Sequence, residues 1–363
     1  MRGEERRQRA VLMVLNLDER VARNHPLRRI KQLAEVVLKQ LSPKFDRMYS
    51  AVGRPSIPPE RLLKASLLMA LYTVRSERMF CEQLDYNLLF RWFLDLELDE
   101  ASFDDSSFST NRARLLQHEV AAEFFFGVVE QARALGLLSS EHFTVDGTLI
   151  EAWASLKSFK RKDQGPSEPP ADRGNPTVNF HGERRSNATH QSESDPEARL
   201  ARKGAGKEAR LCYSGNALVE NRNSLLIDFM VEPADGDAER RAALVMLQGS
   251  LPGTRRITVA GDKGYDTRGF IAECRALNVT PHSAQNHARP GGSALDRRTT
   301  RHPTYALSQL VRKRIEEAFG WMKTIGGLRK TRYRGLARVQ MHAYLVAAAY
   351  NLIRIARLAP APV

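Results

Sequence analysis

The chain has 363 residues, with 56 lysines and arginines against 42 aspartates and glutamates, and therefore a formal net charge of +14. Its 42% hydrophobic content supports at least one substantial core and excludes a simple disordered basic tail. An excess of positive charge this large indicates a polyanionic partner. The three cysteines lie far apart with no CxxC pair, which supports neither a disulfide framework nor a zinc module.

The apolar segments predict neither export nor membrane insertion. The N-terminal run VLMVL is too short for a signal peptide and is followed by Asn16 and Asp18. The most apolar late stretch, 339–355, contains His342, Asn351 and Arg354, so it predicts a buried terminal helix and not a membrane span. We therefore expect a cytoplasmic protein with no membrane partner.

Residues 1–136 predict an all-helical N-terminal region. Apolar residues recur at three- and four-residue spacing over 27–41 and 59–73, Ser76 can cap a further helix, and a last helix stops at Gly136. Short basic helices of this kind could hold a helix-turn-helix that binds DNA. A helical bundle with merely solvated charges is an equally good interpretation.

Residues 137–358 predict an α/β domain. The segment HFTVDGTLI alternates and is β-branched, CYSGNALVE and SLLIDFMVEP flank a turn at 221–223, and RITVAGD and NVTPHSA alternate with helical segments. This order predicts a mixed five-stranded sheet flanked by helices. The polar segment 155–210, rich in glycine, proline, serine and charges, is expected to be a flexible insert outside the core.

Two aspartates stand out by their positions in the predicted strands. Asp146 lies inside the first strand, where an isolated carboxylate is costly unless it is paired or bound to a metal. Asp262 follows RITVAG, at the end of a strand, where α/β sheets bind ligands. A lone aspartate in a strand is more often a turn or ion-pair residue, so neither position alone establishes a catalytic site.

A third carboxylate comes from the helix VRKRIEEAFGWMK. At about 100° per residue, Ile315, Phe319 and Met322 form one apolar stripe, and Glu317 falls nearly opposite it. Glu316 lies at the edge of the stripe, within roughly 40° of Arg312 and Lys323. Glu316 is therefore the glutamate that we expect to point into a cleft.

Three carboxylates from two strands and a helix suit a hard cation. Mg²⁺ takes oxygen ligands, usually one or two carboxylates together with phosphate oxygens of the substrate. Two such ions about 4 Å apart can activate water or a 3′-hydroxyl and stabilise the leaving oxygen of a phosphodiester. We therefore expect a nucleic-acid-processing enzyme that uses two Mg²⁺ ions, with Mn²⁺ as a substitute.

Positive charge is concentrated beside this predicted site. Residues 311–338 contain nine lysines and arginines against two glutamates. A charge run is usually a solvated face, but this one adjoins a glycine pair and Tyr333, which favours contact with a phosphate backbone. The basic residues expected to bind DNA are Arg312, Lys323, Arg329, Lys330, Arg332 and Arg334.

Other chemistry has little support in the sequence. Nucleotide-binding glycine motifs and Ser/His/Asp signatures are absent, so no nucleotide cofactor is expected. Five histidines in polar segments lack paired metal spacing and are predicted to be surface residues: His181, His190, His282, His287 and His302.

The segments VDGTLIEAWASLKSFKRKD, GDKGYD and RIEEAFGWMK resemble the motifs of bacterial insertion-sequence transposases of the DDE class, in the IS-five group. FDDSSFSTNRARL resembles the N-terminal region of the same group, and the resemblance extends over roughly 22–358. The Y-x2-R-x3-E-x6-K signature of related cut-and-paste enzymes is matched by Arg312, Glu316 and Lys323. Gln309 stands at the tyrosine position, so a role for that residue is not carried over.

The resemblance implies a ribonuclease-H-like core in which Asp146, Asp262 and Glu316 are the catalytic, metal-binding residues. It also implies an enzyme that binds the terminal inverted repeats of its element, cleaves the ends and joins the 3′-hydroxyls to target DNA. The enzyme is expected to act as a homodimer on DNA, at the bacterial nucleoid. A metal-dependent nuclease of the same fold and a DNA-binding regulator with an inactive core remain as alternatives.

Overall fold

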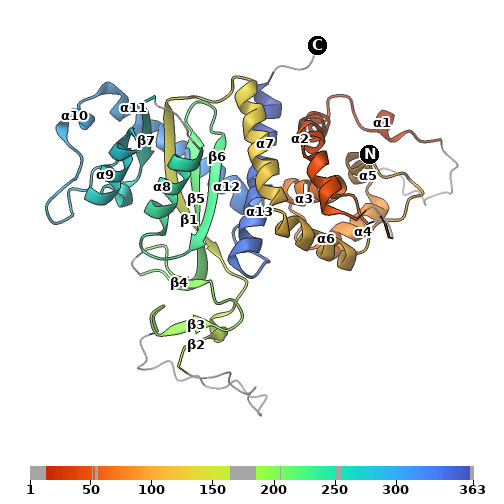
Figure 1. Cartoon of the computed structure of the whole chain (residues 1–363), viewed down its shortest axis with the longest axis horizontal. Helices are drawn as coiled ribbons and strands as arrows, with labels where there is room; N and C mark the ends of the chain where they lie inside the picture. The colour runs from red at the N-terminus through yellow and green to blue at the C-terminus, as the bar shows by residue number, and fades with distance from the viewer. Residues whose placement is uncertain are drawn as a thin grey trace, which may run out of the picture.

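The computed structural model describes residues 14–50, 52–53, 56–163, 185–204, 206–250 and 255–359. Every regular element before residue 142 in these ranges is a helix, as predicted, and these helices lie together on one side of the molecule (Figure 1). They are α1 (Leu17–Arg20), α2 (Pro26–Met48), α3 (Pro59–Leu71), α4 (Glu77–Tyr86), α5 (Leu88–Leu94), α6 (Asp105–Gln117) and α7 (Val120–Ala134).

Capping residues set the ends of these helices. Ser76 accepts a hydrogen bond from the Met79 amide, and Asp104 accepts one from the Ser107 amide. The helix that Ser76 caps, α4, ends at Tyr86, and the side chain of the next residue, Asn87, caps α5. The expected helix ending at Gly136 is two helices, because Glu119 adopts a left-handed conformation with φ 53° between α6 and α7.

The sheet has the predicted strands: β1 (His142–Glu151), β5 (Arg210–Glu220), β6 (Leu226–Pro233), β7 (Ile257–Gly261) and β8 (Val279–Ser283). Its order is β6-β5-β1-β7-β8. Strands β1, β5 and β6 are antiparallel neighbours, whereas β7 and β8 run parallel to β1. Three antiparallel strands followed by two parallel ones confirm the ribonuclease-H-like core.

The polar segment 155–210 is more ordered than its composition predicted. Its described residues form η1 (Leu156–Ser158), the two-stranded sheet of β2 (Phe159–Arg161) and β3 (His190–Ser192), and β4 (Arg199–Ala201), which pairs with the start of β5. Asp195, only 1% exposed, accepts hydrogen bonds from the Tyr213 hydroxyl and the Gly335 amide. Buried polar bonds hold this segment, and hydrophobic periodicity cannot reveal them; residues 164–184 lie outside the described ranges.

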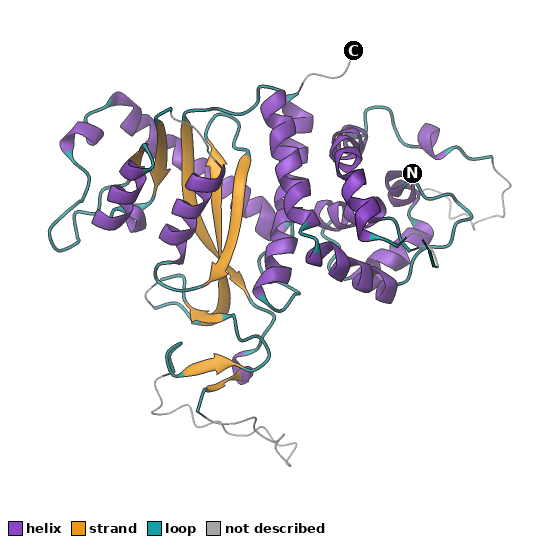
Figure 2. Cartoon of the chain, viewed as in Figure 1, coloured by secondary structure: helices purple, strands orange, loops and turns teal. Residues whose placement is uncertain are grey.

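Helices cover the sheet and connect it to the N-terminal region (Figure 2). The remaining helical elements are α8 (Ala238–Ser250), η2 (Lys263–Tyr265), α9 (Arg268–Ala276), α10 (Arg297–Thr300), α11 (Pro303–Val311), η3 (Arg312–Arg314), α12 (Ile315–Thr324) and α13 (Leu336–Leu358). None of the helices in the described ranges is long and apolar enough to cross a membrane.

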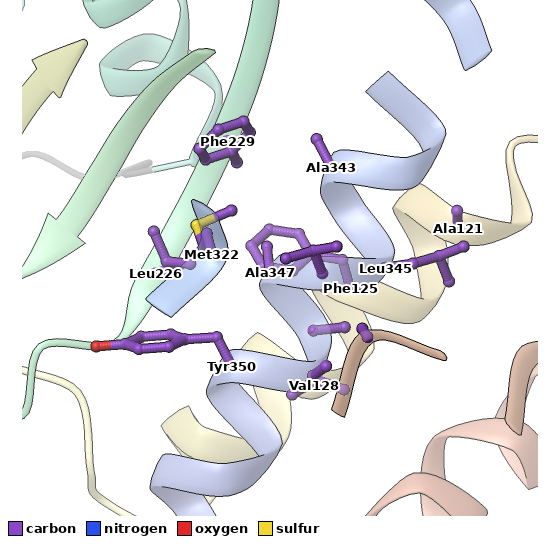
Figure 3. Close-up of a cluster of buried hydrophobic side chains, with 14 of the residues drawn as sticks. Ala121, Phe125, Val128, Leu226, Phe229, Met322, Ala343, Leu345, Ala347 and Tyr350 are labelled. Carbon is purple, nitrogen blue, oxygen red and sulfur yellow. The ribbon is translucent and has the colours of Figure 1, made fainter. Parts of the chain in front are cut away.

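Helix α13 is the buried terminal helix that the sequence predicted. It packs on β6 and α12 on one side and on α7, α3 and α2 on the other, so one hydrophobic core is continuous across both regions (Figure 3). Its amide side chains also satisfy the outer edge of β6: Asn351 bonds to the amide and carbonyl of Leu226, and Gln340 to the Val231 amide and the Phe229 carbonyl.

Candidate active site

The parallel pairing of β1 and β7 brings Asp146 and Asp262 together. Thr144 lies opposite Ala260 in the register of the two strands, and the aspartates follow two residues later in each chain segment. Because parallel strands advance in step, the two carboxylates leave the sheet at neighbouring positions on the same face. The sequence placed each aspartate in its element; the pairing makes them one site.

The environment of Asp146 disfavours the ionised form of its carboxylate. Burial raises the pKa of Asp146 to about 7, and the negative charges of Asp262 and Glu239 act in the same direction. The Gly147 amide donates a hydrogen bond of 2.9 Å to the Asp146 carboxylate and, with the Arg312 charge, opposes this shift. The site therefore carries negative charge that the surrounding protein does not fully neutralise.

Asp262 is fixed by the turn that follows β7. Its carboxylate accepts a 2.7 Å hydrogen bond from the Gly264 amide and caps η2. The next loop is fastened by Asp266, a fully buried residue whose carboxylate accepts hydrogen bonds from the amides of Asn286 and Ala294. The GDKGYD segment thus presents one aspartate to the site and uses the other to position the loop after β8.

The sequence analysis missed a third carboxylate at this place, Glu239. It lies in the first turn of α8 and packs directly on Gly147, where an added Cβ would come within 2.5 Å of its side chain. Burial raises the pKa of Glu239, and the Asp262 charge adds to the effect. The signal available in the sequence was a glycine inside a strand, which often marks a close approach from another element.

The structure separates the two glutamates of α12. Ile315, Phe319 and Met322 are buried as predicted, and Glu317 forms an ion pair of 3.3 Å with Arg354 of α13. Glu316 is exposed and lies one turn after Arg312, whose charge acts on Asp146. This supports the choice of Glu316, but Glu316 is not among the main charges that shift the pKa of Asp146, and its membership of the site stays a prediction.

The carboxylates fit a hard cation by their donor chemistry. Oxygen ligands alone, in a partly buried site with uncompensated negative charge, match what Mg²⁺ and Mn²⁺ prefer. Within the described ranges no three Asp, Glu, His or Cys side chains already converge closely enough to enclose an ion. Two carboxylates together with phosphate oxygens are sufficient for Mg²⁺. Glu239 is a further oxygen donor whose charge acts on Asp146.

Residue 309 takes part in the site through its hydrogen bonds. The Gln309 amide donates to the His282 carbonyl at 2.6 Å and accepts from the Arg312 guanidinium at 3.1 Å, so it ties the end of β8 to Arg312. His282 itself is buried and bonds to Ser308, and burial lowers its pKa to about 4. The prediction of surface histidines is therefore wrong for His282 and for the buried His190, while His181 lies outside the described residues.

The predicted basic residues continue from this site along β1. Lys323 lies near Cys212 and near the charges of Lys203 and Arg329, and its pKa is lowered first by burial and then by these cations. The backbone of 329–331 pairs with Glu151 at the end of β1, and Lys330 forms an ion pair of 3.4 Å with that glutamate. Arg334 is exposed after this segment.

The Arg332 side chain points toward the N-terminal helices and not along β1. Its guanidinium donates a 2.8 Å hydrogen bond to the Arg75 carbonyl in the N-terminal region and stacks over Tyr333 at 5.0 Å. This contact fastens the basic segment to the turn before α4, so Arg332 has a structural role whether or not it also contacts DNA.

A family model described as "Transposase DDE domain" matches residues 141–352, more than half of the chain. The chain belongs to this transposase family. A second model, "Transposase domain (DUF772)", matches residues 15–114 in the helical region. No curated protein gives a significant match.

Solved structures similar to this transposase include DNA complexes of other transposases. The piggyBac synaptic complex with hairpin DNA has 10% identity and a TM-score of 0.40, over 91% of this chain and 75% of that one. The pre-cleavage Mos1 transpososome has 10% identity and a TM-score of 0.21, over 89% and 96%. The Mos1 paired end complex with Mn has 13% identity and a TM-score of 0.20, over 89% and 84%. These scores are too low to add to the family assignment.

Proposed function

We propose that this chain is the transposase of a bacterial insertion sequence of the IS-five group. It binds the terminal inverted repeats of its element, cleaves the DNA at the ends and transfers the 3′-hydroxyls to target DNA. The observation that carries the proposal is that Asp146 and Asp262 each follow, two residues later, the paired residues Thr144 and Ala260 of two parallel strands in a transposase fold.

Asp146, Asp262 and Glu316 would hold two Mg²⁺ ions, with Mn²⁺ as a substitute. Bound there, the ions would supply activation of water or a 3′-hydroxyl and stabilisation of the leaving oxygen. The turn after β7 orients Asp262, and the Gly147 amide orients Asp146. Partial burial keeps bulk water from screening the charges, which strengthens their attraction for a cation.

DNA would lie along β1, with its phosphates on the basic residues that begin beside Asp146. Arg312 stands at the carboxylates, and Lys323, Arg329 and Lys330 continue toward the end of β1. Exposed Trp153, 5.9 Å from the Lys330 ammonium, adds an aromatic surface to this end. Arg334 extends the path, whereas Arg332 chiefly fastens it to the helical region.

The N-terminal helices would recognise the sequence of the element's ends, and two chains would act together because each element has two ends. The protein would work at the nucleoid in the bacterial cytoplasm. Short inverted repeats flanking the gene would support this assignment directly.

Cleavage of labelled terminal-repeat DNA tests the proposal. Incubation with Mg²⁺ should give nicks at the element ends and, with target DNA present, joined products; EDTA should abolish both, and zinc should not be required. Nicking without joining would indicate a nuclease of the same fold. Specific binding with neither reaction would indicate a regulator with an inactive core, and full activity in EDTA would overturn the two-metal mechanism.

A further inference from the structure

A glycine directly after Asp146 makes room for a side chain from another element. Gly147 lies in the middle of β1, where glycine has no side chain to pack and weakens the strand. A Cβ at this position would meet the Cγ and Oε1 atoms of Glu239 at 2.5 Å. Glu239 therefore occupies the space over residue 147 that the Cβ of any other residue type would fill.

No residue in the described ranges bonds to the Glu239 carboxylate, and the Arg240 charge alone favours its ionised form. Its carboxylate makes no hydrogen bond or ion pair with any residue that the structure describes, although the residue is half-buried. The adjacent Arg240 donates instead to the Gly264 and Gly236 carbonyls and to Asp237. A shielded carboxylate beside other carboxylates is costly unless a cation compensates it.

We propose that Glu239 is a ligand of the metal site, in addition to Asp146 and Asp262. The inference rests on the proposed function and deepens it: α8, which packs on β1, contributes an oxygen donor, and Gly147 leaves room for it. The first turn of α8 suits this role because the helix N-terminus stabilises a carboxylate before the cation binds.

A purely structural glutamate would be expected to accept a hydrogen bond or to pair with a cation of the protein. Glu239 does neither in the described residues, and its carboxyl end lies where the Cβ of a residue other than glycine would stand at position 147. The flexible side chain needs only a change of rotamer to move its carboxylate, because no bond holds it in place.

The test is Mn²⁺ binding to the full-length protein without DNA, measured by calorimetry and by the Mn²⁺-induced rise in melting temperature. Glu239→Gln keeps the shape and removes the charge, and should weaken Mn²⁺ binding by about tenfold or more. Gly147→Ala, which pushes Glu239 away, should weaken it similarly. Glu273→Gln, at an exposed position on α9, is the matched control and should bind like the wild type.

Asp262→Asn separates failure of the inference from failure of the proposed function. If Asp262→Asn loses Mn²⁺ while Glu239→Gln binds it as tightly as the wild type, Glu239 is not a ligand and the proposed function stands. If the wild type binds no Mn²⁺, or Asp262→Asn binds it unchanged, the metal site itself is wrong and the inference falls with it. If Gly147→Ala does not fold, the Glu239→Gln variant still tests the inference, because glutamine has nearly the same shape as glutamate.

Discussion

The two halves of β1 are opposite in charge. Around its middle, Asp146, Asp262 and Glu239 face one another with Arg312 as the cation that acts most strongly on Asp146. At its end, Glu151 is surrounded by Lys330 and Arg210, with Lys323 and Arg329 close by. The two places are separated by about 17 Å along one strand.

Both places bring like charges close together, and this shows what each is suited to bind. In the first, burial and carboxylate repulsion raise the pKa of Asp146; in the second, burial and neighbouring cations lower the pKa of Lys323. A bound metal cation would reduce the repulsion among the carboxylates, and the phosphates of a DNA backbone would reduce the repulsion among the lysines and arginines. DNA carries phosphates, and the proposed chemistry needs metal ions, so one substrate complex would satisfy both.

The largest expected effect is loss of catalysis from the acidic half. Asp146→Asn, Asp262→Asn and Glu316→Gln should each lower end cleavage at least about a thousandfold, equivalent to about 4 kcal/mol, while DNA binding persists. The measurement is single-turnover cleavage of labelled terminal-repeat DNA. Glu317→Gln should stay active because Glu317 pairs with Arg354; an inactive Glu317→Gln beside an active Glu316→Gln would reverse the choice of glutamate.

The same carboxylates should cost folding stability in the absence of metal. The unfolded chain loses the Asp146 proton near pH 4 and the folded chain near pH 7, so the stability present at low pH is lost as pH rises through 7. Asp146→Asn should therefore raise the free energy of unfolding at pH 8 in EDTA by up to about 4 kcal/mol, and by less as pH falls to 5.

Urea unfolding at several pH values measures this gain, with Asp99→Asn at an exposed position as the control. Saturating Mn²⁺ should reverse the order, because only the wild type gains binding energy. If Asp146→Asn does not raise the free energy of unfolding at pH 8, the ionised Asp146 carboxylate does not destabilise the folded protein.

The basic half should affect binding and not chemistry. Arg329→Ala combined with Lys330→Ala should lower the slope of log affinity against log salt by about 1.8 on duplex DNA, with preference for the element's ends preserved. Affinity measured at several salt concentrations tests this, and Arg357→Ala, at an exposed position near the end of α13, serves as the control. A double variant that keeps its salt slope but loses end preference would make this half a base-reading surface.

The smallest effect is expected from Arg332. Because its guanidinium bonds to the Arg75 carbonyl, Arg332→Ala should lower the free energy of unfolding by about 1 to 2 kcal/mol and leave the salt slope unchanged. Denaturant unfolding and the same salt series measure the two quantities. A flattened slope without loss of stability would mean that Arg332 belongs with Arg329 and Lys330 on the DNA.

Most elements of the fold could be predicted because each leaves a local signal. Capping side chains such as Ser76 and Thr267 hydrogen-bond within their own helix, and the alternation in β1 reflects its own two faces. The helix breaks at Asn87 and Glu119 were missed although they are local, and the other errors occurred where a partner distant in the chain decided the outcome. Asp195 is buried by Tyr213 and Gly335, so a polar segment that looked like a loop is held against the sheet.

The sequence by itself determined the type and order of the elements, the strands that carry Asp146 and Asp262, and the apolar stripe of α12, because periodicity and caps act over a few residues. Only the tertiary structure decided that β1 and β7 pair in a register that brings the two aspartates close together. It also decided that Arg354 forms an ion pair with Glu317, and that Glu239 fills the space over Gly147. These last contacts join residues far apart in the chain, and their energies depend on burial and on neighbouring charge that exist only once the sheet and its helices have packed.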